Sequence, residues 1–172
     1  MFEHPKPLIL AYSDRQIAQG PTYLVSTSAS GDNGWLCSTD VPIKDRIRCV
    51  EAMAPLFAQL FAPRCTPHLS HLSEAGGPLN GVCYMWWDEL PCLALADDPN
   101  LSMHETALAT MASILGFDSI ACQESALHGL GHWQRAYDRQ ISAIIDGFLS
   151  RNPDIDPRLL TYAKSARCGC VL

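Results

Sequence analysis

The sequence lacks the long apolar run that a membrane-spanning helix needs. No stretch approaches the roughly 18 apolar residues of such a helix, and residues 1–12 carry neither the basic start nor the apolar core of a secretory signal. We therefore expect a cytoplasmic protein with no membrane partner. In that compartment the eight cysteines should stay reduced, and most should serve as small core residues.

Signatures of common enzymes are missing as well. The chain contains no Gly-x-Ser-x-Gly nucleophile motif, no phosphate-binding Gly-x-x-x-x-Gly-Lys loop, no dinucleotide-binding Gly-x-Gly-x-x-Gly and no Cys-x-x-Cys pair. The sequence therefore predicts no catalytic residue and no cofactor. Basic residues are outnumbered by acidic ones, with a net charge of −6, which disfavours nucleic acid and suits a basic protein partner.

What is present is the composition of a folded protein, with 48% hydrophobic and 17% charged residues among 172. We expect an N-terminal arm over residues 1–40 and an all-helical domain over residues 41–172. Within the arm, Leu8–Tyr12 and Thr22–Ser26 are short and carry aromatic or β-branched residues, so they predict a small hairpin or an irregular segment.

From residue 41 onward apolar residues recur every three or four positions, which is the helical period. The first such face consists of Ile47, Val50, Ala54, Phe57 and Phe61. Pro55 lies inside it and should kink or split the helix. A connector rich in proline and glycine follows over residues 62–80, and Asn80 should cap a short helix over residues 81–90.

The C-terminal part predicts four helices, joined by short connections that make sequential helices antiparallel neighbours. They span residues 101–115, 119–137, 138–152 and 156–167, and the last has an aspartate cap followed by proline. The predicted fold class is thus mainly α, a bundle or array of antiparallel helices.

Two of these helices resemble a HEAT or armadillo unit. The resemblance lies in the small and apolar pattern of residues 107–115 and of residues 122–132. It implies closely packed helix pairs and a protein-binding role, and it covers less than half of the chain. No internal repeat of fixed period accompanies it.

Glu124, His128 and His132 follow one another at intervals of four, so they share one face of the predicted helix. Two histidines at this spacing can bind one metal ion. A third ligand would have to come from elsewhere, and His68, His71 and His104 are the candidates. Glu124 lies too far along the face to join both histidines on one ion. The alternative is a polar stripe that binds a protein partner.

Glycines 129 and 131 lie inside the same helix, where each costs about 0.5–1 kcal/mol relative to alanine. Such positions favour the close approach of another helix or of a bound partner.

A second candidate surface is the run from Cys83 to Leu90. Trp86 and Trp87 point about 100° apart on a helix, so one should pack inside while the other is free to anchor a partner, unless both bridge the helices and the arm. The predicted partner-binding residues from the two surfaces are Glu124, His128, His132, Trp133, Trp86, Trp87, Asp88 and Glu89.

These observations favour a non-enzymatic binding protein with a basic protein partner. Adaptors and the immunity proteins that neutralise bacterial toxins are functional analogues for a small acidic chain of this type. The alternative is a metal-dependent hydrolase or lyase centred on His128 and His132.

Overall fold

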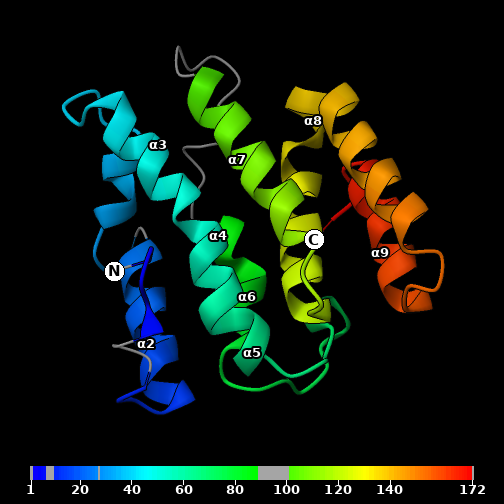
Figure 1. Ribbon diagram of the computed structural model, residues 1–172, viewed down its shortest axis with the longest axis horizontal. Coiled ribbons are helices and arrows are strands. Elements are labelled where there is room, and N and C mark those ends of the chain that lie inside the picture. The colour runs from blue at the N-terminus through cyan, green and yellow to red at the C-terminus, as the bar shows by residue number, and fades with distance from the viewer. Residues whose placement is uncertain (1, 7–9, 27, 89–100, 172) are drawn as a thin grey trace.

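The computed structural model describes residues 2–6, 10–26, 28–88 and 101–171. Helices dominate these ranges and no strand occurs in them, which confirms the mainly α fold class. Figure 1 shows the helices side by side, from α2 and α3 at one edge to α9 at the other. The helices are α2 (Asp14–Val25), α3 (Ile43–Glu51), α4 (Met53–Leu56), α5 (Ala62–Arg64), α6 (Asn80–Tyr84), α7 (Leu101–Ile114), α8 (Ile120–Arg151) and α9 (Pro157–Arg167).

The predicted hairpin of the N-terminal arm is wrong. Its second strand, Thr22–Ser26, is mostly the last turn of α2, and its first falls partly on residues outside the described ranges. A reciprocal cap starts α2, because Ser13 Oγ accepts from the Gln16 backbone N–H while Gln16 Oε1 accepts from that of Ser13. The domain boundary near residue 40 stays a prediction, although the arm adds three residues to the common core: Ile17, Val25 and Leu36.

Pro55 splits its helix as predicted. The helix α3 ends at Glu51, α4 covers Met53–Leu56, and a π-helical turn, η2 (Phe57–Phe61), follows. Proline has no N–H to donate to the carbonyl four residues earlier, so the helical ladder is interrupted at this point.

The predicted cap at Asn80 is wrong. Asn80 lies within α6, whose N-cap is Leu79, and its side chain instead ties down the connector. Its Oδ1 accepts hydrogen bonds from the backbone N–H groups of Thr66 and Gly77, at 3.0 and 3.1 Å. Because Thr66 lies 14 residues before Asn80, only the tertiary fold could reveal this contact.

The C-terminal helices lie where they are predicted. Ser119 caps α8 and Asp156 caps α9. The 32-residue α8 consists of two helices joined by a kink at Tyr137, whose φ and ψ of −131° and 37° are not helical. The kink coincides with the boundary predicted between residues 137 and 138. Neither α8 nor any other helix within the described ranges is long and apolar enough to cross a membrane.

Six cysteines within the described ranges are free thiols, as expected. Cys37 departs from that expectation, because it is disulfide-bonded. Cys83 and Cys122 are buried, whereas Cys168 and Cys170 are exposed at the end of α9.

Both glycines of the histidine-bearing segment of α8 lie against other parts of the chain. A Cβ on Gly129 would lie 2.6 Å from Cγ of Trp87 and 2.8 Å from Sδ of Met111. A Cβ on Gly131 would lie 2.6 Å from Val171, where the chain end returns toward α8 (Figure 1). The predicted close approach is therefore made by the protein's own elements.

We expect Gly129→Ala to lower the free energy of unfolding by about 1–3 kcal/mol, because the new methyl group overlaps a buried indole. Gly147→Ala is the matched control in the same helix. There the nearest neighbour is the guanidinium end of Arg151 at 3.3 Å, which can move aside. The control should be neutral or stabilising by up to about 1 kcal/mol. Urea denaturation measures both, and equal effects would contradict the packing described.

Candidate metal centre

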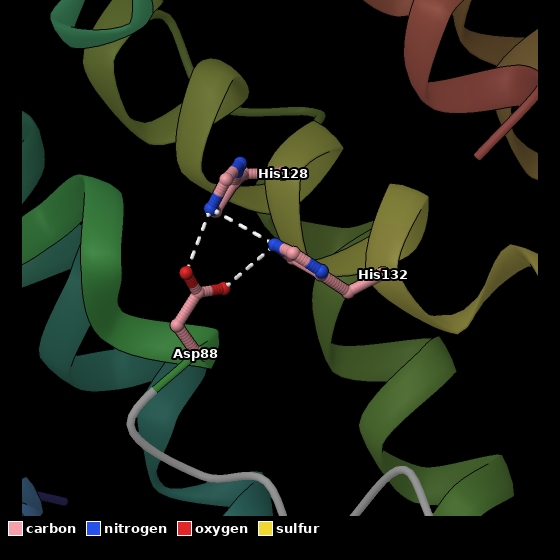
Figure 2. A group of neighbouring side chains, drawn as sticks. All are labelled: Asp88, His128 and His132. Atoms are coloured by element: carbon pink, nitrogen blue, oxygen red, sulfur yellow. Dashed lines mark hydrogen bonds and ion pairs between the residues drawn. The ribbon is translucent and has the colours of Figure 1, made fainter. Parts of the chain in front are cut away.

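Three side chains from two elements converge on one point (Figure 2). His128 and His132 project from one face of α8, and Asp88 approaches from the end of η4 (Met85–Trp87). His128 Nε2 lies 3.0 Å from Asp88 Oδ2, His132 Nε2 lies 3.1 Å from Asp88 Oδ1, and the two Nε2 atoms are 3.2 Å apart. Among the described residues, this is the one group of three or more ligating side chains close enough to share a metal ion.

Packing between η4, α6 and α8 brings Asp88 to the histidines. The indole of Trp87 lies against α8 at Gly129, so the next residue, Asp88, reaches the neighbouring His128. A hydrogen bond from Ser125 Oγ to the carbonyl of Cys83 fixes α6 to α8 just beside this contact. The centre therefore depends on a glycine that exposes the helix backbone.

Hydrogen bonds alone do not satisfy this triangle of atoms. Each of its three sides needs one proton, but the two Nε2 atoms supply at most two, and the carboxylate of Asp88 supplies none. If both nitrogens donate to Asp88, two N–H groups face each other across 3.2 Å. A cation at the centre would instead accept lone pairs from all three side chains.

The distances suit a small transition-metal ion. Donor atoms about 2.0–2.1 Å from a tetrahedral zinc ion lie about 3.3 Å from one another, close to the separations of 3.0–3.2 Å between these side chains. Two imidazoles and one carboxylate favour Zn²⁺ or Fe²⁺ over Mg²⁺ and Ca²⁺, which prefer oxygen ligands.

Without an ion, the centre carries a strong internal ion pair. Burial raises the pKa of the Asp88 carboxyl, but hydrogen bonds from His128 and His132 outweigh burial and hold that pKa well below its ordinary value. The hydrogen bond to Asp88 in turn raises the pKa of His132, against the opposing effect of its partial burial.

The second nitrogen of His128 is held by a tyrosine. Its Nδ1 lies 2.6 Å from the hydroxyl of Tyr162 on α9, and that hydroxyl lies 3.1 Å from the hydroxyl of Tyr84 on α6. The ring of Tyr84 also packs on the His128 ring, with centroids 4.2 Å apart. His128 is therefore fixed from both sides.

Glu124 has a different role from its neighbours on α8. It is fully buried, and its oxygens accept from the backbone N–H groups of Ser70 and His71, both at 2.9 Å, and from His71 Nδ1 at 2.6 Å. The carboxylate thus anchors the connector to α8. Glu124 does not belong to the group of side chains close enough to share a metal ion.

Most of the predicted partner-binding residues lie in the interior. Of the eight, five are at most 3% exposed: Glu124, His128, Trp133, Trp86 and Trp87. Both tryptophans are buried and both contact Phe57. Trp86 packs edge-on against Phe57 and Phe61, whereas Trp87 stacks on Phe57 and packs on α8 at Gly129. Asp88 and His132 remain partly exposed, and Glu89 lies outside the described residues.

The third ligand is the residue that sequence reasoning missed. None of the candidates joins the pair, since His68 bonds Thr66, His71 bonds Glu124 and His104 bonds Tyr137. The sequence points to Asp88 only as a neighbour of two tryptophans in the run from Cys83 to Leu90. No spacing rule links it to histidines 40 and 44 positions later.

We expect the stability difference between the ion-free protein and its Asp88→Asn variant to depend on pH. The raised pKa of His132 stabilises the fold below its ordinary value of 6.5, and this contribution is lost as pH rises. The lowered pKa of Asp88 stabilises the fold above 3.8, and this contribution is lost as pH falls.

Urea denaturation with a chelator present should therefore show the largest difference between pH 3.8 and 6.5. From that window to alkaline pH, the difference should shrink by less than about 1 kcal/mol, because solvent screens the half-exposed His132. A difference that grows with rising pH would contradict the ion pair.

Comparison of the chain with protein-family models, with curated proteins and with solved structures finds no match. The resemblance to HEAT units accordingly stays a prediction.

Proposed function

We propose that this protein binds one divalent transition-metal ion at Asp88, His128 and His132, and that the bound ion serves hydrolysis or a related lyase reaction. The observation that carries the proposal is the convergence of these three side chains, with ligand atoms 3.0–3.2 Å apart. Zinc is the ion to test first, because its bond lengths and its preference for nitrogen and oxygen ligands fit the group.

The three ligand side chains differ in how far they are exposed to solvent. This partial exposure supports a reactive ion rather than a purely structural one. The side chain of His128 is 1% exposed, that of Asp88 23% and that of His132 43%. Three protein ligands leave one position of a tetrahedral ion for water or substrate. We place that position next to His132, on the side of the centre where this ligand is partly exposed.

The chemistry follows from the ion. A divalent ion with an open position lowers the pKa of a bound water to near neutrality and polarises a substrate carbonyl or phosphoryl oxygen. The protein's own contribution is to hold the ligands in place. With Glu124 engaged by the connector, Asp88 is the carboxylate that the described residues place beside the ion.

Binding of a basic protein partner, as in adaptors and immunity proteins, stays a prediction. Such a partner could not bind the five buried residues among the predicted partner-binding set, so it would need another surface of the protein. The metal proposal requires no such surface, and it uses Asp88, His128 and His132 in their observed positions.

We expect the protein purified without chelator to carry about one equivalent of metal, and the demetallated protein to rebind Zn²⁺ with a rise in melting temperature. His132→Ala should weaken binding by more than about 100-fold, because loss of a ligand exceeds the effect of losing an outer partner. Elemental mass spectrometry and titration calorimetry measure these outcomes. The half-exposed position of His132 should let the variant fold.

His4→Ala is the control, since His4 is exposed and outside the cluster. It should bind zinc as the unaltered protein does. Equal binding by His132→Ala would refute the centre. One equivalent of iron in place of zinc would support the metal centre and make oxygenase chemistry the competing function, because two histidines and a carboxylate also make the iron site of oxygenases.

A further inference from the structure

We propose that Tyr162 is the positioning residue of this metal centre, holding the ring of His128 so that its Nε2 faces the ion. This inference rests on the proposed function and deepens it. A histidine that ligates metal through one nitrogen usually donates its other N–H to a fixed partner, which sets the tautomer and the ring orientation. The hydroxyl of Tyr162, 2.6 Å from Nδ1, occupies that partner position.

The hydrogen-bond directions agree with this role. When Nε2 of His128 faces an ion it carries no proton, so the single proton of the neutral ring lies on Nδ1 and is donated to the oxygen of Tyr162. Tyr162 can then donate its own proton to the hydroxyl of Tyr84, 3.1 Å away. All three side chains, His128, Tyr162 and Tyr84, can be neutral in this series of hydrogen bonds.

Tyr162 is itself held rigidly enough to position another side chain. Its ring is 6% exposed and stacks on the ring of His71, with centroids 3.9 Å apart and planes 16° from parallel. His71 is fixed in turn by the buried Glu124 at 2.6 Å. The Glu124–His71 pair therefore contributes to the centre indirectly, because it restrains Tyr162, which in turn positions His128.

A second tyrosine–histidine hydrogen bond in this protein serves as a control for the one between Tyr162 and His128. Tyr137 also places its hydroxyl against Nδ1 of a buried histidine, His104, and it lies on α8, the helix that carries both histidine ligands. His104 is outside the ligand group. Loss of the Tyr137 hydroxyl therefore removes the same kind of bond without touching a metal ligand.

The test uses Co²⁺, whose visible absorption reports the geometry of its ligands as well as its binding. Tyr162→Phe keeps the ring stacked on His71 and removes only the hydroxyl. We expect it to weaken Co²⁺ binding about 10–100-fold and to alter the absorption spectrum of the bound ion. Tyr137→Phe should leave affinity and spectrum unchanged, and thermal unfolding of both variants checks that the fold is kept.

Binding and spectrum equal to those of the unaltered protein in Tyr162→Phe would overturn the positioning role while leaving the metal centre intact. Failure of the unaltered protein to bind Co²⁺ would overturn the centre and this role together. If Tyr162→Phe does not fold, Tyr84→Phe replaces it. That variant should give a smaller loss in the same direction, and an unchanged affinity would overturn the proposal.

Discussion

The contact between the indole of Trp87 and the backbone of α8 at Gly129 is the constraint on which the candidate metal centre depends. A helix interior disfavours glycine, but here its missing side chain lets η4 lie directly on α8. That approach buries Trp87 and carries Asp88 to the two histidines. A methyl group at position 129 would separate the two elements that supply the ligands, so the packing of the core and the geometry of the site cannot vary independently.

Around this contact the protein buries several polar groups. Glu124 and His128 are almost completely removed from solvent, and Tyr162 nearly so. Burial of such groups is unfavourable unless each finds partners, and an unsatisfied one costs about 1–3 kcal/mol. Glu124 receives three hydrogen bonds from the connector, and Tyr162 joins His128 to Tyr84. The network connects the connector, α6, α8 and α9 to one another. It thereby restrains the positions of the ligand side chains.

Much of the helical architecture could be predicted from sequence because its signals are local. The aspartate and proline that begin α9, and the serine that caps α8, act within a few residues of themselves. The errors fall where another contact outweighs the signal that the sequence suggests. The strand propensity of Thr22–Ser26 yields to a helix that begins at a reciprocal cap, and Asn80 caps nothing because its side chain bonds the connector. The two adjacent tryptophans are both buried, because both contact Phe57 while Trp86 also packs on Phe61 and Trp87 on α8.

The sequence by itself determined the fold class and the pairing of His128 with His132, since a spacing of four residues on a helix leaves two side chains no other relative position. Only the tertiary structure decided that Asp88 completes the group, that Tyr162 holds His128, and that Glu124 faces the connector. These residues are separated by tens of positions in the chain and meet only where helices pack. Helical periodicity fixes which face a residue lies on, whereas the packing of the whole core fixes what that face meets.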